Sequence, residues 1–275
     1  MKTIKAIKFL SEGTSTISLA KVSNQIDYYI LLEYSYNGVD WDRWDFSSLT
    51  INQGNALYIR GDNPYGFCRN DEFYTFIIKG DNVSCSGNIM SLIDYRTLPN
   101  VIPNSFCFCG LFKNCTALTT APELPATELT DRCYCKMFFG CTSLKASPEL
   151  PAKNIVDFCY SWMFYGCSSL TTAPELPAMI LADSCYYQMF SKCTSLTTAP
   201  ELPATELAES CYESMFSNCY SLTTAPELPS TKLADYCYSW MFYGCTSLIK
   251  IPKLPIADLT TCCYYQMFKD CTLLK

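Results

Sequence analysis

The sequence predicts an α/β repeat solenoid, built from short parallel strands and short helices, that follows a small all-β sandwich-like domain. Three observations support this fold class. Cysteines recur every 26 residues from residue 107 onward, each repeat has a half of helical period and an extended half, and the stretch before residue 86 shows strand-like alternation. A chain of 275 residues can adopt this architecture without one large core, because each repeat packs against its neighbours.

Residues 1–85 are expected to form the amino-terminal β domain. Apolar and polar residues alternate there in short runs, separated by clusters of Asn, Gly and Pro that favour turns. Asn37-Gly38 predicts a two-residue hairpin turn, since both residue types tolerate the positive φ that such a turn requires. Strands are predicted at residues 16–19, 32–36, 49–51, 56–60 and 73–79.

Residues 86–275 are expected to form the solenoid, and two cysteine ladders define its repeat. Because each ladder repeats one position seven times, its members are structural equivalents rather than independent chemical sites. We expect all of them to line the core. The first ladder comprises Cys107, Cys133, Cys159, Cys185, Cys211, Cys237 and Cys263. The second follows eight residues later and comprises Cys115, Cys141, Cys167, Cys193, Cys219, Cys245 and Cys271.

One repeat, residues 193–218, illustrates the two halves. Its first half, around residues 196–202, is rich in Thr and contains Pro200, which is incompatible with a helix interior and indicates a short strand. On a helical wheel at about 100° per residue, the apolar residues of the second half share one arc, which predicts a short helix with one buried face. That arc collects Cys211, Tyr212, Met215, Phe216 and, at the start of the next repeat, Cys219.

Both ends of the solenoid depart from the repeat. The degenerate stretch 86–99 carries Leu98-Pro99 one period before Leu124-Pro125, which indicates an amino-terminal cap. The other end stops within a repeat at Lys275, without a recognisable polar cap. We therefore expect an open carboxyl-terminal end that can self-associate.

Composition argues against nucleic-acid binding and against a membrane span. The chain has 26 acidic and 20 basic residues, and no run of Lys or Arg offers the positive patch that binds phosphate backbones. Lysines interrupt the apolar residues near the start, so we expect neither a secretion signal nor a stretch of about 18 apolar residues. A cytoplasmic location, cleavage from a precursor and export by another route all stay open.

The absence of histidine weighs against an enzyme. It removes Ser-His-Asp and Cys-His activation of a nucleophile, and every zinc site that needs imidazole. No catalytic residue, metal site or cofactor is therefore predicted. A carboxylate hydrolase or a thiol-redox protein is the enzymatic alternative, because acidic residues and thiols remain available.

The cysteines are expected to be free thiols. The two ladder positions within a repeat would lie about 12 Å apart along a helix, beyond the Cα separation of about 7 Å that a disulfide tolerates. Neighbouring helices would hold equivalent cysteines about 8–10 Å apart, which is also too far. Cys109 and Cys135 fall on the expected solvent face, and Cys262 adjoins a ladder member; these three are the candidates for reactivity.

A repeated glutamate is the first candidate binding feature. It occupies one position of the predicted strands, so equivalent side chains would stack about 5 Å apart. Such a row can attract Ca²⁺ or a basic partner, and the structural alternative is a solvated rim with weak repulsion. Lys253 stands at this position in the last full repeat. The row comprises Glu123, Glu149, Glu175, Glu201 and Glu227.

Aromatic pairs outside the buried arc are the second candidate. Trp162 with Tyr165, and Trp240 with Tyr243, lie on the expected outer face, where such rings can stack on sugars or anchor a protein partner. Packing between adjacent helices is the structural alternative. Residues 159–167 recur identically 78 residues later, so duplication of a block of repeats also accounts for the two pairs.

The pattern Met-Phe-x-x-Cys-Thr/Ser-x-Leu, followed by a proline-ended strand, recurs through the solenoid and is clear at 163–170 and 241–248. It resembles the 26-residue repeat of bacterial surface proteins, related to BspA-type leucine-rich repeats, over residues 86–275. The resemblance implies a leucine-rich-repeat solenoid on surface-exposed, often adhesive proteins of bacteria and their mobile elements, without catalytic residues. The helix-opening cysteine and the Ala-Pro-Glu-Leu-Pro strand differ from the aliphatic residue and Asp-Leu-Ser-type strand of many relatives.

These features predict a non-enzymatic binding or adhesion protein that presents its solenoid surface to a protein or glycan partner. The alternative is a structural or assembly component of a virion, fibre or surface layer, in which the solenoid serves as a spacer. The resemblance implies a location at the cell surface, outside the cell or on a virion.

Overall fold

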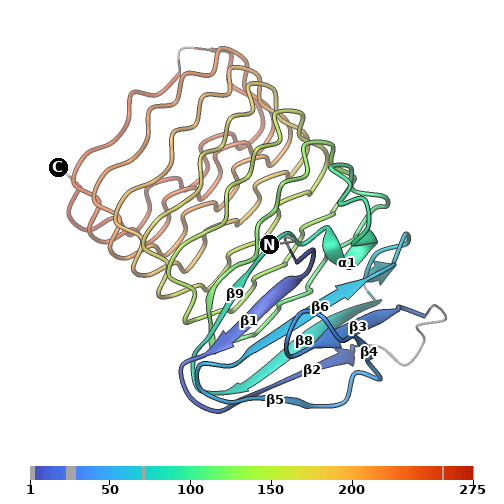
Figure 1. Ribbon diagram of the computed structural model, residues 1–275. Helices are drawn as coiled ribbons and strands as arrows, with labels where there is room; N and C mark the ends of the chain where they lie inside the picture. The colour runs from blue at the N-terminus through green and yellow to red at the C-terminus, as the bar shows by residue number, and fades with distance from the viewer. Residues whose placement is uncertain (1–3, 23–28, 70–71, 256, 275) are drawn as a thin grey trace.

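A computed structural model of the protein describes residues 4–22, 29–69, 72–255 and 257–274. A domain of β-sheets lies at one end, and the rest of the chain winds into coils that stack away from it toward the carboxyl terminus (Figure 1). The described residues contain one helix, α1 (Ser91–Asp94). No helix in this part of the chain has the length and apolar character needed to cross a membrane.

Two sheets form the β domain. The first has the strand order β10-β9-β1-β6-β3-β4, and the second has the order β5-β2-β8-β7. Their inward faces meet in an aromatic core, where the rings of Phe9 and Phe76 lie 5.6 Å apart in an edge-on arrangement. The strands are β1 (Ile7–Ser11), β2 (Ser15–Lys21), β3 (Leu32–Ser35), β4 (Asp42–Arg43), β5 (Leu49–Ile51), β6 (Ala56–Gly61), β7 (Cys68–Arg69), β8 (Glu72–Gly80), β9 (Val83–Ser86) and β10 (Leu118–Thr120).

The five predicted strands are confirmed as β2, β3, β5, β6 and β8, whereas β1, β4, β7 and β9 are not among the predicted strands. The two-residue hairpin predicted at Asn37-Gly38 is wrong: of these residues only Gly38 has a positive φ, and residues 36–41 form a longer loop between β3 and β4. Oδ1 of Asn37 shapes this loop by accepting hydrogen bonds from the backbone N–H groups of Val39 and Asp40, at 2.8 and 2.9 Å. The side chain thus replaces the tight turn with an Asx-type loop.

The β domain supplies the surface on which the first coil stacks. β9 pairs in parallel with β10, which belongs to the first repeat. The rings of Phe67 and Phe76 stack on those of Phe108 and Phe112, at 6.0 and 5.0 Å. The buried side chains of sandwich and coils consequently form one continuous core. The predicted cap, residues 86–99, contains α1 and lies at this junction.

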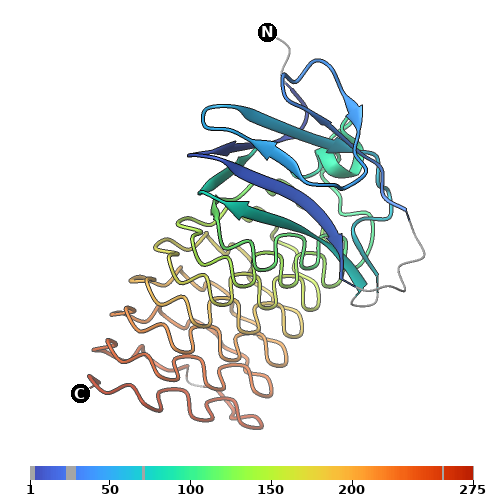
Figure 2. The ribbon, with the colours of Figure 1, turned by 90° about the horizontal axis from the view of Figure 1, so that it is seen from below.

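The short helices predicted in the repeats are wrong, because these segments are series of turns. The N–H of Tyr187 donates to the carbonyl of Ser184 three residues back (3.2 Å), whereas the N–H of Tyr186 donates to the carbonyl of Cys211 in the next coil (3.1 Å). This alternation continues along the segment, and φ is positive every fourth residue. We call this side of the solenoid the turn wall, whose regular undulation is visible in Figure 2. It comprises residues 106–115, 132–141, 158–167, 184–193, 210–219, 236–245 and 262–271.

A four-residue period explains the burial pattern of the turn wall as well as a helix does. At about 100° per residue, the apolar residues at the first, second, fifth, sixth and ninth places fall on one arc of a helix. With a period of four residues, the first, fifth and ninth places point in one direction, and the second and sixth places point in another. Nine residues are too few to separate these periods. Turns are favoured because every second N–H remains free to donate to the neighbouring coil, whereas a helix uses these groups internally and is marginal at this length.

The opposite wall contains less β-structure than predicted. After β10, the described repeats contribute isolated parallel bridges, such as Thr198 with Thr224, instead of a continuous sheet. Each Pro-Glu-Leu-Pro segment lacks two N–H donors, so a hydrogen-bonded ladder cannot continue through it. The backbone is still extended, and alternate side chains point inward and outward, as Leu202 is buried while Glu201 is exposed.

Candidate binding surfaces

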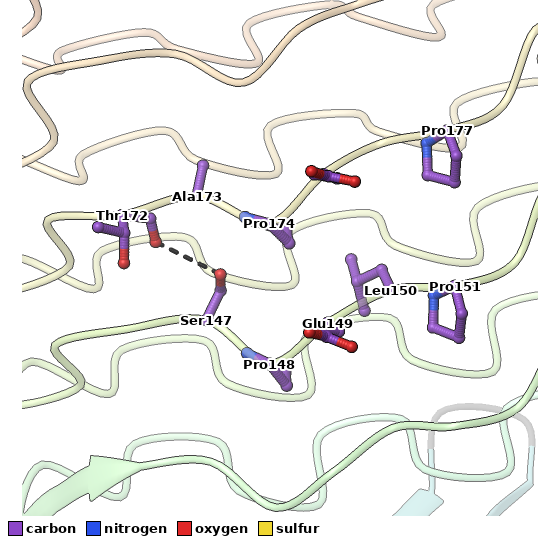
Figure 3. Close-up of a pocket in the computed structure, with 10 residues that line it drawn as sticks. Ser147, Pro148, Glu149, Leu150, Pro151, Thr172, Ala173, Pro174 and Pro177 are labelled. Carbon is purple, nitrogen blue, oxygen red and sulfur yellow. Dashed lines mark hydrogen bonds between the residues drawn. The ribbon is translucent and has the colours of Figure 1, made fainter.

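The Pro-Glu-Leu-Pro segments of successive coils form a row of hollows on one side of the solenoid. We call this side the proline face; it comprises residues 122–125, 148–151, 174–177, 200–203 and 226–229. Three hollows have volumes of about 450, 440 and 450 Å³, and a fourth, beside Lys253, measures about 310 Å³. In the hollow of Figure 3, Pro148 and Pro174 lie at equivalent places of adjacent coils, and the hydroxyl of Ser147 donates to the carbonyl of Thr172 at 3.3 Å.

The glutamate row lies on the proline face. All five side chains are exposed, whereas the leucine that follows each one is buried. Each of the three larger hollows is lined by glutamates of two successive coils, such as Glu149 and Glu175. The row therefore combines negative charge with rigid pyrrolidine rings at a constant spacing. The residues are Glu123, Glu149, Glu175, Glu201 and Glu227.

The aromatic pairs of the turn wall pack between coils, which is the structural alternative given for these residues. Trp162 is half-buried and meets Tyr187 of the next coil edge-on at 4.8 Å, with the ammonium of Lys136 4.8 Å above its ring. Tyr165 instead stacks on Phe139 of the preceding coil at 4.6 Å. The first pair is thus a set of contacts between coils.

The second aromatic pair follows the same plan. Trp240 is half-buried, meets Tyr265 edge-on at 5.2 Å and donates from Nε1 to Oε1 of Gln266 at 3.0 Å. Tyr243 is half-buried and lies 5.9 Å from the ammonium of Lys269. Packing between coils engages much of the aromatic surface that the sequence suggests is free.

The fourteen ladder cysteines are free thiols, and all are buried apart from the half-buried Cys271. In the second ladder the thiol donates to a phenylalanine carbonyl of the preceding layer, which is β8 for Cys115 and the preceding coil for the others, as for Cys193 and Phe164 at 3.1 Å. Burial raises the pKa of the Cys133 and Cys141 thiols to about 12, so these groups are protonated at neutral pH. Their environment is that of packing residues with weak hydrogen bonds.

Repeats of this construction identify the family. The model of the BspA type leucine rich repeat region matches at residues 108–248 and 178–275, in six copies. The chain belongs to this family. BspA-type repeats are typical of surface or protein-interaction proteins and are generally non-enzymatic, and the leucine-rich-repeat fold of the chain agrees with that class.

The chain is also similar to a solved structure, that of a leucine-rich repeat protein from Bacteroides ovatus. The identity is 22% and the TM-score is 0.39. The similarity covers 64% of this chain and 46% of the other, so this chain spans less than half the length of that relative. No curated protein matches the chain.

The spacing of coils in this BspA-type solenoid differs from the spacing assumed for helices. Adjacent coils are joined by backbone hydrogen bonds, and stacked rings such as Tyr134 and Tyr160 lie 5.9 Å apart. Equivalent cysteines are therefore closer than the about 8–10 Å expected of packed helices. The cysteines of both ladders are free, and the thiols of the second ladder donate to backbone carbonyls, as Cys193 does to Phe164, instead of to one another.

Two cysteines outside the ladders depart from their predicted setting. Cys109 and Cys135, expected on the solvent face, are only 2% and 5% exposed, because they point into a small core beside the turn wall. Cys68 of β7 joins them there, which the sequence does not reveal because it lies outside the repeat. Cys262 is exposed.

A second carboxylate row, missed by the sequence analysis, has a structural role. Oδ1 of Asp157 accepts a hydrogen bond from the backbone N–H of Asp183 in the next coil at 3.1 Å, and Oδ1 of Asp183 accepts one from Glu209 at 3.1 Å. Their 26-residue spacing is the signal that could have found them. No cluster of three or more His, Cys, Asp or Glu side chains in the described part of the chain is arranged to hold a metal ion.

Proposed function

We propose that this chain is a non-enzymatic binding protein and that its proline face contacts an extended, positively charged segment of a partner protein. The observation that carries the proposal is the row of similar hollows, each formed by prolines and glutamates of successive coils. A repeated surface of this kind suits a ligand that contacts several coils at once. Interaction roles are also typical of the family.

The proline face is preorganised for binding. Proline fixes its own φ and restricts the residue before it, so little backbone entropy is lost when a ligand docks. The inward leucines anchor each segment to the core, with Leu176 and Leu202 each 3% exposed. Hydrophobic ring surfaces beside fixed charges provide both contact area and orientation.

Charge favours a basic partner. None of the ion pairs found among the described residues involves a glutamate of the proline face. Like charges repeated on adjacent coils repel one another, and a Lys- or Arg-bearing segment would relieve that repulsion. The half-buried tryptophans of the turn wall offer a weaker surface, because Tyr187 and Tyr265 already cover part of their rings.

The test compares three double variants. Wild type, Glu175→Gln/Glu201→Gln and Trp162→Ala/Trp240→Ala are screened against arrays of lysine-containing peptides and of glycans, and hits are quantified by calorimetry. Glu128→Gln/Glu206→Gln is the matched control, since these glutamates are exposed on the solenoid but do not line the hollows. We expect saturable peptide binding that falls at least tenfold in the first variant only, and that weakens with salt.

Three outcomes contradict the proposal. Glycan binding without peptide binding would show that the ligand is not a basic peptide segment. Equal affinity of the proline-face variant and its control would exclude this surface. Concentration-dependent self-association in sedimentation velocity, without any saturable ligand, would favour the assembly role instead.

A further inference from the structure

Three cysteines of successive layers gather where the β domain meets the solenoid. Cys68 belongs to β7, Cys109 to the first coil and Cys135 to the second. Together with Phe73 they form a small buried cluster that is separate from the main core. We call these three residues the cysteine triplet.

The central thiol of the triplet contacts both others. The side chain of Cys109 lies within hydrogen-bonding reach of Cys135 on one side and of Cys68 on the other. This contact differs from that of the ladder cysteines, for example Cys193, whose thiol donates to a backbone carbonyl. Thiol-to-thiol contact across layers about 5 Å apart is the arrangement from which a disulfide can close after a small rotation about the side-chain bonds.

The cover over the triplet is thin compared with that over the ladders. Phe106 and Trp162, both only partly buried, pack against the cluster. Movement of the Trp162 side chain would open the triplet to a small reagent, whereas access to the ladders would require separation of the coils. The ammonium of Lys136 lies over the Trp162 ring. The contact with Cys135 and the charge of Lys136 lower the pKa of the Cys109 thiol, but the contact with Cys68 and burial outweigh them, so this pKa is raised.

We propose that the cysteine triplet is a thiol–disulfide exchange site in which Cys109 is the shared partner of Cys68 and Cys135. The co-reactant is a low-molecular-weight disulfide such as oxidised glutathione. The thiolate of one triplet cysteine attacks it, which forms a mixed disulfide and releases one small thiol. A second triplet thiolate then attacks the protein sulfur and releases the other small thiol, so two protein thiols are oxidised while one small disulfide is reduced.

The third cysteine of the triplet stays a thiol and can attack the new bond. A bridge between Cys68 and Cys109 joins the β domain to the first coil, and a bridge between Cys109 and Cys135 joins the first two coils. Exchange between these bridges needs no further oxidant, because one disulfide is replaced by another. The ladder cysteines, which lie in the main core, take no part.

The test is peptide mapping after incubation of the native protein with oxidised glutathione. The background carries Cys262→Ser, which removes the one exposed thiol. We expect a mass loss of about two hydrogen atoms, a linked peptide that contains Cys109, and a higher Tm that dithiothreitol reverses. Cys68→Ser and Cys135→Ser should each still form the remaining bridge.

Cys109→Ser should form neither bridge and should show no redox-dependent change in Tm. Cys109→Ala serves the same purpose if the serine variant does not fold. A disulfide between ladder cysteines, a triplet disulfide that lacks Cys109, or no disulfide in the folded protein would each overturn the proposal.

Discussion

Replacing Ser230 with alanine should destabilise the solenoid by leaving a buried tyrosine hydroxyl without a partner. Tyrosines stack in the core at 26-residue intervals, with neighbouring rings such as Tyr212 and Tyr238 5.8 Å apart. Oη of Tyr238 lies 3.0 Å from Oγ of Ser230, and both residues are buried. In the preceding repeats alanine stands at the equivalent position, eight residues before the tyrosine, as Ala178 does before Tyr186.

Repeats that lack this serine indicate how much stability its removal costs. The hydroxyls of Tyr134, Tyr160 and Tyr186 are buried and lack a hydrogen-bond partner among the described residues. Loss of one buried partner costs about 1–3 kcal/mol, reduced here because the serine hydroxyl itself no longer needs to be desolvated. We therefore expect Ser230→Ala to lower the free energy of unfolding by about 1–2 kcal/mol, or about 2–6 °C in Tm.

The reverse substitution tests the same reasoning with the opposite sign. Ala178→Ser places a hydroxyl where Ser230 has one, and Ala178 is 1% exposed, so the new group must bond to Tyr186 or remain unsatisfied. We expect a gain of about 0.5–1.5 kcal/mol. A control, Ala173→Ser, adds the same hydroxyl at a half-buried site on the same repeat and should change stability little.

Urea denaturation followed by far-UV circular dichroism measures all three variants, and hydrogen exchange in residues 211–245 reports local opening of the affected coils. Equal stability of Ser230→Ala and wild type, together with destabilisation by Ala178→Ser, would refute the pairing. Destabilisation by both substitutions would show that shape rather than hydrogen bonding decides at this position.

Three further predictions concern packing, backbone conformation and pH. Cys211 is fully buried, so Cys211→Leu should overpack the wall and cost about 1–3 kcal/mol, more than Cys211→Ala does; equal Tm shifts would contradict this reasoning. Gly166 has φ of 71°, and a Cβ there would meet only an ordinary contact, Cα of Gly140 at 3.9 Å, so Gly166→Ala should cost about 1 kcal/mol through backbone strain alone in urea denaturation. Burial raises the pKa of the Cys133 and Cys185 thiols from 9.0 to about 12, and the unfolded chain therefore loses these protons first. The resulting stabilisation is complete below about pH 8.5 and declines as the pH rises toward 12, so Tm measured from pH 8 to 11 should fall; a constant Tm would contradict it.

The repeat, its buried face and five strands of the β domain could be predicted because they depend on periodicity. Burial of Cys211, Tyr212 and Met215 follows from a side-chain pattern that is the same for a helix and for four-residue turns. The choice between them depends on what the backbone N–H groups do, and that is decided by the neighbouring coil. One local signal was available: Gly166 and Gly244 stand at the third positive-φ place of their segments, where glycine is favoured.

The proline face could also be predicted in part. Alternation places Glu201 outward and Leu202 inward, whatever the extent of the sheet. The hollows between coils could not be predicted, because they depend on the spacing and tilt of successive segments. The contacts of Trp162 were equally inaccessible, since its partner Tyr187 lies in the next coil and its assigned neighbour Tyr165 packs on the preceding one.

The hydrogen-bond pattern of the turn wall explains why a thiol suits the second ladder. The carbonyl of Phe164 accepts the N–H of Cys167 within its own coil at 3.0 Å and takes no backbone hydrogen bond from the next coil. Its remaining lone pair faces the next coil, where the thiol of Cys193 donates to it. Alanine would leave that lone pair unpaired, and leucine would exceed the space between the layers. Cysteine provides a weak donor on a small apolar side chain, so it satisfies the carbonyl without bringing a strongly hydrated group into the core.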